Sequence, residues 1–133
     1  MMRKFFLSID LFHKYKWSDY FTPPTDAEVL NTLVQAKKYN TRITIQNYKH
    51  RLTLPVLGGI GCIFVLHGSI KITMNNQKTV KSIELREGEF CRIPYGKYIY
   101  EHSDECSYIT MVLYEEFPKE TRKKIAEHYG KKI

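Results

Sequence analysis

The part of the chain between residues 42 and 114 consists of short segments in which apolar and polar side chains alternate. Ile43 and Ile45, for example, are separated by Thr44, and this period of two is typical of a half-buried strand. Further strands are predicted near residues 52–54, 62–66, 69–74, 80–85, 89–93, 98–102 and 108–114. Residues 55–61, with three glycines, are predicted to form a turn. Strands this short and this closely spaced predict an antiparallel sandwich or barrel.

The two ends of the chain have a different pattern. Thr25 and Glu28 have the spacing of a capping box, and apolar residues at helical spacing predict a helix over residues 27–38. Pro118 is placed to begin a C-terminal helix, because proline is favoured in the first turn. A length of 133 residues predicts a single domain. Its expected parts are an N-terminal arm and helix (1–41), a barrel (42–117) and a C-terminal helix (118–133).

Composition narrows the class of protein. No apolar run approaches the roughly 20 residues that cross a bilayer, and the apolar run near the N-terminus is too short for a signal peptide. The three cysteines, Cys62, Cys91 and Cys106, are odd in number and lack CxxC spacing, which is typical of reduced thiols. We therefore expect a cytoplasmic protein without membrane contact.

The net charge of +7 comes from the ends of the chain. Residues 61–117 carry six basic and eight acidic side chains, so the predicted barrel is slightly acidic. Basic ends can attract nucleic acid or an acidic partner, or they can simply be solvated surface. No zinc-finger spacing favours nucleic acid further.

One stretch carries a family resemblance. The nine residues from Gly88 to Gly96 read Gly-Glu-Phe-Cys-Arg-Ile-Pro-Tyr-Gly, and Ile99 follows. Together with the segment from Gly61 to Gly68, this stretch resembles the two signatures of the cupin superfamily. The resemblance covers residues 43–117. It implies a mainly β fold, a single jelly-roll antiparallel β-barrel, to which the sequence adds an N-terminal and a C-terminal helix.

The cupin resemblance also implies four metal-ligand positions, and here they hold Pro55, Leu57, Gly61 and Ile99. None of these residues supplies the imidazole or carboxylate that a hard or borderline metal needs. We therefore expect no metal and no other cofactor. The five histidines form no i, i+4 pair, and nothing in the sequence requires catalysis.

Strand parity predicts which side chains line the barrel. In the cupin family the residue at position 99 points inward, and successive strand residues alternate, so Ile99 and Glu101 are predicted to face the interior. The same reasoning applies to Thr53 and Arg51, and the apolar face of the last strand is taken as inward. The predicted ligand-binding residues are Arg51, Thr53, Ile99, Glu101, Ile109 and Met111. Such a mixture is typical of a small-molecule site. The alternative is a solidly filled barrel with an Arg51–Glu101 pair at its rim.

A narrower resemblance concerns function. The segments 66–75, 88–96, 103–105 and 112–117 are similar to those of the N-terminal sensor domains of AraC-type transcription regulators. This resemblance implies a metal-free, homodimeric, ligand-sensing domain for a small molecule, possibly a sugar, with contacts at Thr53, Glu101, Ile109 and Met111. No helix-turn-helix follows residue 117, so DNA would be bound only through a domain absent from this chain.

Two other functions remain open. One is a stand-alone binding or assembly cupin that acts through protein partners. The other is a metal-independent sugar isomerase or epimerase, which needs a positioned acid or base near its substrate. A homodimer is expected, because the apolar stripe predicted on the C-terminal helix is too narrow to be buried without a partner.

Overall fold

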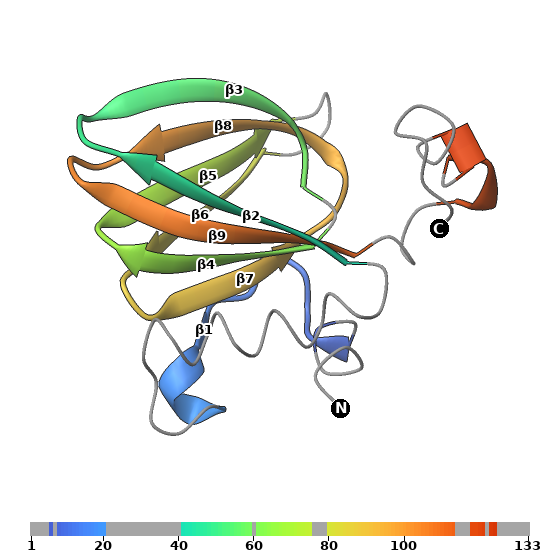
Figure 1. Cartoon of the computed structure of the whole chain (residues 1–133), viewed down its shortest axis with the longest axis horizontal. Coiled ribbons are helices and arrows are strands. Elements are labelled where there is room, and N and C mark those ends of the chain that lie inside the picture. Colours follow the sequence, from blue (N-terminus) through green and yellow to red (C-terminus); the bar gives the residue numbers. More distant parts are fainter. Residues whose placement is uncertain are drawn as a thin grey trace.

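Two antiparallel β-sheets packed face to face form the body of the protein in a computed structural model (Figure 1). The structure describes residues 6, 8–20, 41–59, 61–75, 80–113, 118–121 and 123–124. The strands are β1 (Tyr15–Lys16), β2 (Thr41–Tyr48), β3 (Leu52–Gly58), β4 (Gly61–His67), β5 (Ser69–Asn75), β6 (Val80–Arg86), β7 (Glu89–Ile93), β8 (Gly96–His102) and β9 (Cys106–Leu113). A short 3-10 helix, η1 (Trp17–Asp19), follows β1. The prediction of a mainly β, antiparallel fold is therefore confirmed.

The structure describes only part of one of the two predicted helices. The helix predicted over residues 27–38 lies outside the described residues. From the C-terminal segment the structure describes residues 118–121 and 123–124, of which 119–121 and 123–124 are helical, so the complete helix stays a prediction. In the part of the chain that is described, no helix is long and apolar enough to cross a membrane.

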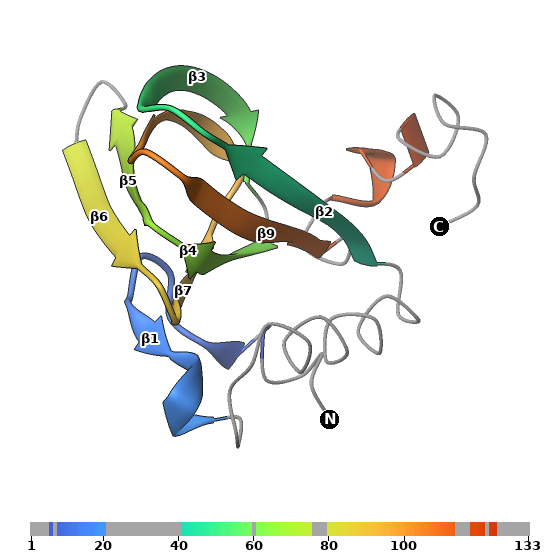
Figure 2. The same cartoon turned by 60° about the vertical axis from the view of Figure 1, so that its left-hand side comes forward.

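The sheet order shows how the chain moves between the layers. One sheet has the order β1-β7-β4-β9-β2 and the other the order β3-β8-β5-β6. In the turned view of Figure 2, β1 lies beside β7, at the opposite side of its sheet from β2. The consecutive strands β2 and β3 are edge strands of different sheets and do not pair with each other. The predicted turn over residues 55–61 is wrong in extent, because β3 continues to Gly58 and β4 begins at Gly61.

The space between the sheets holds one of two apolar clusters, which we call the inner cluster. Its members include Ile63, Val65, Ile70, Ile72, Leu85, Ile93, Tyr98, Tyr100 and Tyr108. These residues alternate along their strands with residues of the opposite face, as a period of two requires. Burial of this much aromatic and aliphatic surface is the main source of stability for the barrel.

The second cluster, the outer cluster, covers the other face of the five-stranded sheet. The N-terminal segment contributes Phe6, Ile9 and Trp17, which pack with strand residues such as Phe64 and Phe90. The segment is also hydrogen-bonded to β7, since Arg92 Nη1 donates to the carbonyl of Ile9 at 2.9 Å. Both faces of β4, β7 and β9 are therefore buried.

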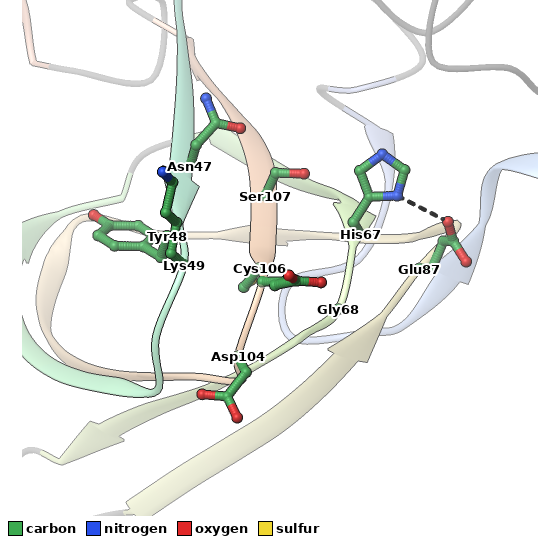
Figure 3. A pocket seen from close by; sticks show the side chains of 10 residues that line it. Asn47, Tyr48, Lys49, His67, Gly68, Glu87, Asp104, Cys106 and Ser107 are labelled. Carbon is green, nitrogen blue, oxygen red and sulfur yellow. Dashed lines mark hydrogen bonds and ion pairs between the residues drawn. The ribbon is translucent and has the colours of Figure 1, made fainter.

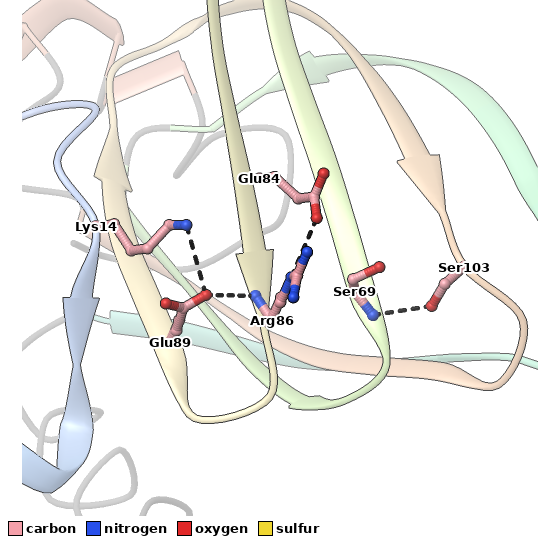
Figure 4. Close-up of polar contacts among 6 residues, drawn as sticks. All are labelled: Lys14, Ser69, Glu84, Arg86, Glu89 and Ser103. Carbon is pink, nitrogen blue, oxygen red and sulfur yellow. Dashed lines mark hydrogen bonds and ion pairs between the residues drawn. The ribbon is translucent and has the colours of Figure 1, made fainter.

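Polar contacts fix the turns at one end of the barrel (Figure 4). The backbone N–H of Ser69 donates to Ser103 Oγ at 2.8 Å, and the N–H of Ser103 donates to the carbonyl of Ser69 at 3.0 Å. Nearby, Glu89 Oε1 accepts a hydrogen bond from the N–H of Arg86 at 2.7 Å and lies 3.8 Å from Lys14 Nζ. The second contact attaches the N-terminal segment to the β6–β7 turn.

Candidate functional site

A cavity of about 240 Å³ lies between the two sheets. Both edge strands, β2 and β3, contribute to its lining, together with β4, β8 and β9. Its polar lining residues are Gln46, Tyr48, Tyr100, Tyr108 and Thr110. Its apolar lining includes Val56, Ile63 and Val112. The volume is smaller than the roughly 300–1,000 Å³ of a site for a drug-sized ligand, so it suits a small molecule.

Strand register explains why these polar groups meet. The pairing of β2 with β9 places Gln46 opposite Tyr108 and Thr44 opposite Thr110. Residues that lie directly opposite each other in an antiparallel pair share a face of the sheet. Tyr100 approaches from β8, which belongs to the other sheet. The cavity therefore receives polar side chains from both layers.

A buried histidine lies next to the cavity, at the end of β8. The ring of His102 is 4.2 Å from the ring of Tyr48 and 5.4 Å from that of Tyr108, measured between centroids. His102 Nε2 is 3.1 Å from Tyr108 Oη, which is hydrogen-bonding distance. Its Nδ1 atom has no hydrogen-bond partner of good geometry in the part of the chain that the structure describes. The histidine thus orients a phenol that faces the cavity.

Burial keeps these groups uncharged near neutral pH. It raises the pKa of Tyr100 well above its usual value, with smaller contributions from Cys91 and Tyr98. It also raises the pKa of Tyr108, and a hydrogen bond with Tyr48 adds to the effect. Burial lowers the pKa of His102, although the backbone of Leu52 opposes this shift. The five polar residues of the cavity carry no formal charge, so the site offers neutral donors and acceptors.

We expect the free energy of unfolding to fall as the pH drops below about 6.5, the value for an unperturbed histidine. Folded His102 has a pKa below that value, so in this range the unfolded state binds more protons and stability rises with pH. Each unit by which the two pKa values differ is worth about 1.4 kcal/mol. Urea unfolding at a series of pH values measures the slope. The slope of the unfolding free energy against pH should decrease in His102→Phe. It should persist in His50→Gln, which alters an exposed histidine. Equal slopes in the two variants would contradict the assignment of the pH dependence to His102.

The structure changes the orientation that the sequence predicted for four of the six ligand-binding residues. Arg51, Thr53, Ile99 and Glu101 are exposed, and Ile99 is 44% exposed on the outer surface of the four-stranded sheet. The prediction that they face the interior is therefore wrong. Arg51 and Glu101 form no ion pair; instead, the backbone N–H of Arg51 donates to Asp104 Oδ1 at 2.7 Å.

The other two residues are buried, but on the opposite face of their strand from the interior. Ile109 and Met111 belong to the outer cluster, under the N-terminal segment. Met111 borders the cavity, but its side chain packs with the outer cluster. The inward side of β9 carries Tyr108 and Thr110 instead. Because both faces of β9 are buried, the apolar face does not mark the interior. Ligand binding by any of the six residues stays a prediction.

The positions that the cupin resemblance assigns to metal ligands do not converge. Pro55, Leu57 and Ile99 lie on the outer surface of the four-stranded sheet. Gly61 lies so close to β9 that a Cβ atom there would be 1.6 Å from the carbonyl oxygen of Met111. No acidic side chain fits at that position. Within the described ranges, no group of three histidine, cysteine, aspartate or glutamate residues could hold a metal ion.

A second hollow, of about 520 Å³, lies at the end of the barrel where several turns meet (Figure 3). It includes a contact at hydrogen-bonding distance between His67 Nδ1 and Glu87 Oε1, which are 3.2 Å apart. Glu87, Asp104 and Glu105 make it more acidic than Lys49 can balance. The side chains of His67 and Glu87 are 59% and 66% exposed, so a ligand here would stay in contact with water. The cavity between the sheets is less open than this hollow and is therefore the better candidate for a specific site.

Comparison with known proteins gives only partial likenesses. No protein-family model matches the chain, and no curated protein sequence is significantly similar to it. A similar structure is that of Drosophila melanogaster CENP-C bound to CAL1 (13% identity, 53% of this chain and 59% of that chain, TM-score 0.43). Another is a mutant of the 3,4-ketoisomerase QdtA from Thermoanaerobacterium thermosaccharolyticum, in complex with TDP-4-keto-6-deoxyglucose (17% identity, 60% of this chain and 62% of that chain, TM-score 0.42). A third is a protein from Neisseria meningitidis, NMB1881 (11% identity, 85% of this chain and 96% of that chain, TM-score 0.43).

The matched region spans about three fifths of the first two of these chains. With TM-scores below 0.5, these likenesses carry no argument about activity. The two antiparallel sheets agree with the architecture that the cupin resemblance implies, and membership of that superfamily stays a prediction. None of the three structures supports the narrower AraC-type resemblance, which stays a prediction.

Proposed function

We propose that this chain binds a small uncharged polar molecule, with the size and polarity of a simple sugar or polyol, in the cavity between its sheets. The observation that carries the proposal is the lining. Gln46 and Thr110 offer an amide and a hydroxyl group, and three tyrosines offer phenols in an otherwise apolar surrounding. A few convergent polar groups in an apolar cavity are the usual make-up of a small-molecule site.

The chemistry of the lining favours neutral ligands. Each phenol and hydroxyl can donate one hydrogen bond and accept others, and Gln46 can do both. The faces of the tyrosine rings are electron-rich and attract the C–H edges of a saturated ring. A charged ligand would lose part of its hydration without gaining an opposite charge, which is unfavourable in a partly buried site.

A sensory role for this binding is the part of the proposal that comes from the AraC-type resemblance. In that role the ligand would change how the barrel associates with a second copy or with another domain, and any DNA contact would require a DNA-binding domain. The alternative is a stand-alone binding or assembly protein with the same cavity. Both roles require ligand binding.

A metal-independent acid–base enzyme is the second candidate, and one observation favours it. Tyr108 faces the cavity and is hydrogen-bonded to buried His102, so the phenol oxygen could accept a proton from a bound sugar while its own hydroxyl proton passes to His102 Nε2, and the reverse transfers would return both protons. A His–Tyr pair of this kind could protonate or deprotonate a bound sugar. Incubation with keto sugars in D₂O separates the two functions, because an enzyme incorporates deuterium at carbon and a binding protein does not.

Thermal unfolding with a compound panel tests the proposal. We expect neutral hexoses or polyols to raise the Tm by several degrees, because a ligand at 100 times its Kd stabilises by about 2.7 kcal/mol. Sugar phosphates should have no effect. Tyr108→Phe should reduce the shift, whereas Tyr95→Phe should not, because Tyr95 is an exposed tyrosine outside the cavity. No response to any neutral compound, or a response only to charged ones, would contradict the proposal.

A further inference from the structure

Three polar residues form a row across neighbouring strands at one end of the five-stranded sheet. Ser107 of β9 lies opposite Asn47 of β2 on one side and opposite His67 of β4 on the other. Residues directly opposite each other in antiparallel strands share a face, with Cβ atoms about 4.5–5.5 Å apart. The serine therefore lies between an imidazole and an amide, and all three residues line the hollow of about 520 Å³ (Figure 3).

A β-bulge brings His67 onto the face of Ser107. Val65 lies opposite Tyr108, but His67, two residues later, lies opposite Ser107, so Leu66 is an extra residue in β4. Without the bulge, strand alternation would put His67 on the side of Val65, which belongs to the inner cluster. Bulges are over-represented next to active sites, where they change the direction of a side chain.

The hydroxyl group of Ser107 is nearly buried and has no hydrogen-bond partner among the described residues. Ser107 as a whole is only 9% exposed. In Figure 3 its hydroxyl points toward the ring of His67. A buried hydroxyl without a partner is costly, and a catalytic role is one of the reasons for which proteins keep such a group.

Glu87 orients the imidazole beside the serine. Glu87 Oε1 lies 3.2 Å from His67 Nδ1 (Figure 3). An ionised carboxylate can only accept a hydrogen bond, so this contact favours the tautomer that has its proton on Nδ1 and its lone pair on Nε2. A lone pair on Nε2 is what a general base needs. Hydroxyl, imidazole and carboxylate in this order activate nucleophilic serines on unrelated folds.

The serine and the imidazole are neighbours without a hydrogen bond between them. Both residues are described, and the contact made by His67 Nδ1 is the one with Glu87. Catalytic hydrogen bonds are often long in free enzymes and shorten only when substrate binds. The side chain of His67 is 59% exposed, so it has room to move toward the serine.

We propose that Ser107, His67 and Glu87 form a second, nucleophilic site that cleaves small esters. Ser107 Oγ attacks the ester carbonyl and forms a C–O bond, while His67 Nε2 takes the hydroxyl proton. The imidazolium gives this proton to the leaving alkoxide as the bond between the alkoxide and the acyl carbon breaks. Water then hydrolyses the acyl-serine through the same proton transfers, which releases the acid and restores the hydroxyl group.

The surroundings of the row favour particular substrates. Asn47, on the other side of Ser107 from the imidazole, can donate an amide N–H to the negative oxygen of the tetrahedral intermediate. Asp104 and Glu105 also line the hollow and make it more acidic than Lys49 can balance. An acidic surface repels anions, so the substrates are uncharged or cationic esters.

The ester-cleaving site does not depend on ligand binding in the cavity between the sheets. The hollow and the cavity share Tyr48, but the residues of the proposed site do not line the cavity. A failure of neutral sugars to bind would therefore leave the ester-cleaving site standing, and an unreactive Ser107 would leave sugar binding standing.

Labelling of the full chain with a fluorophosphonate probe tests the nucleophile. The phosphorus forms a bond to a reactive serine oxygen as the P–F bond breaks, and fluoride and the hydroxyl proton leave. Mass spectrometry of peptides should locate the modification at Ser107, and Ser107→Ala should abolish it. Ser82→Ala, which alters an exposed serine of β6, should be labelled as fast as the original chain. Circular dichroism verifies that the variants are folded.

The rate of labelling tests the base and the residue that positions it. His67→Gln should slow labelling at least about 100-fold, because it removes the general base. Glu87→Gln should slow it at least about tenfold and move the midpoint of rate against pH to lower pH, because the carboxylate no longer stabilises the imidazolium. No modification at Ser107, an unchanged rate in His67→Gln, or an unmoved midpoint in Glu87→Gln would each overturn the proposal.

Discussion

Replacing Gly61 with alanine will destabilise the barrel by more than about 4 kcal/mol, at the upper end of what single substitutions do. The backbone of Gly61 has φ +151°, and its Cβ would lie 1.6 Å from the carbonyl oxygen of Met111 on β9. Real side chains do not approach a backbone atom this closely, so β4 and β9 would have to separate. Urea unfolding followed by circular dichroism measures the loss.

Gly58 provides the matched control, because it has a similar backbone angle without the close contact. Its φ is +141°, and nothing lies within 4 Å of the position that a Cβ would occupy. Gly58→Ala should therefore report the backbone strain alone, which is about 1–3 kcal/mol. Equal losses in the two variants would contradict the close approach of β4 to β9. They would also remove the reason why no acidic residue fits at position 61.

Replacing Thr110 with phenylalanine will weaken ligand binding strongly and leave the barrel folded. Thr110 points into the cavity of about 240 Å³, so an aromatic ring can occupy the space of the ligand and remove a hydroxyl group at the same time. We expect affinity for a neutral sugar to fall at least about tenfold, which corresponds to 1.4 kcal/mol. The substitution also removes the hydrogen bond that Thr110 Oγ1 donates to the carbonyl of Thr44 at 3.4 Å, so we expect the Tm of the free protein to fall by only a few degrees while circular dichroism shows a folded barrel.

Glu101→Gln is the control that separates the cavity from the site first predicted from the sequence. Glu101 is exposed on the outer surface of the four-stranded sheet, so its substitution should change the ligand Kd by less than about twofold (a few tenths of a kcal/mol). Isothermal titration calorimetry with the same neutral sugar measures both variants. Binding that survives Thr110→Phe, or that is lost in Glu101→Gln, would show that the ligand does not occupy the cavity.

The positions of the strands could be predicted from the sequence because they depend on local pattern. The segment predicted at residues 89–93 coincides with β7, and the strands predicted near 62–66 and 69–74 correspond to β4 and β5, which Gly68 separates. Gly68 and Gly88 have φ angles of +77° and +82°, which glycine adopts at little cost. Turn residues and a period of two therefore located most strands of the barrel, with the exception of the second half of β3, which was predicted as a turn.

The direction of the side chains could not be predicted, because it depends on what covers the sheet. Ile109 and Met111 alternate with Tyr108 and Thr110, and in a sheet with one wet face the aliphatic residues would face inward. Here the N-terminal segment packs Trp17 and other apolar residues against the side of β9 that carries Ile109 and Met111, so both faces of β9 are buried. The sequence of β9 alone does not indicate that a distant segment of the chain buries its second face.

A usable signal for the cavity was nevertheless present in the sequence. Tyr98, Tyr100 and His102 follow a period of two on β8, and Tyr108 begins the same pattern on β9. Large aromatic residues with polar tips are frequently buried when a partner is available for the tip. The prediction instead relied on the family resemblance, which places residue 99 in the interior and therefore predicted Ile99 and Glu101, rather than Tyr98 and Tyr100, to point inward. The metal ligands of the family are absent, and the residues at those positions face outward or have no room for a side chain.

Tyrosine-resolved NMR tests the central claim most directly. In protein with isotope-labelled tyrosine rings, titration with neutral hexoses and polyols should shift the signals of Tyr48, Tyr100 and Tyr108 with one common, saturable Kd. The signal of exposed Tyr95 should stay in place. Single tyrosine-to-phenylalanine variants assign the signals. Shifts confined to the three cavity tyrosines are the result that a binding barrel predicts. The absence of any shift across the panel, or shifts only outside the cavity, would contradict it.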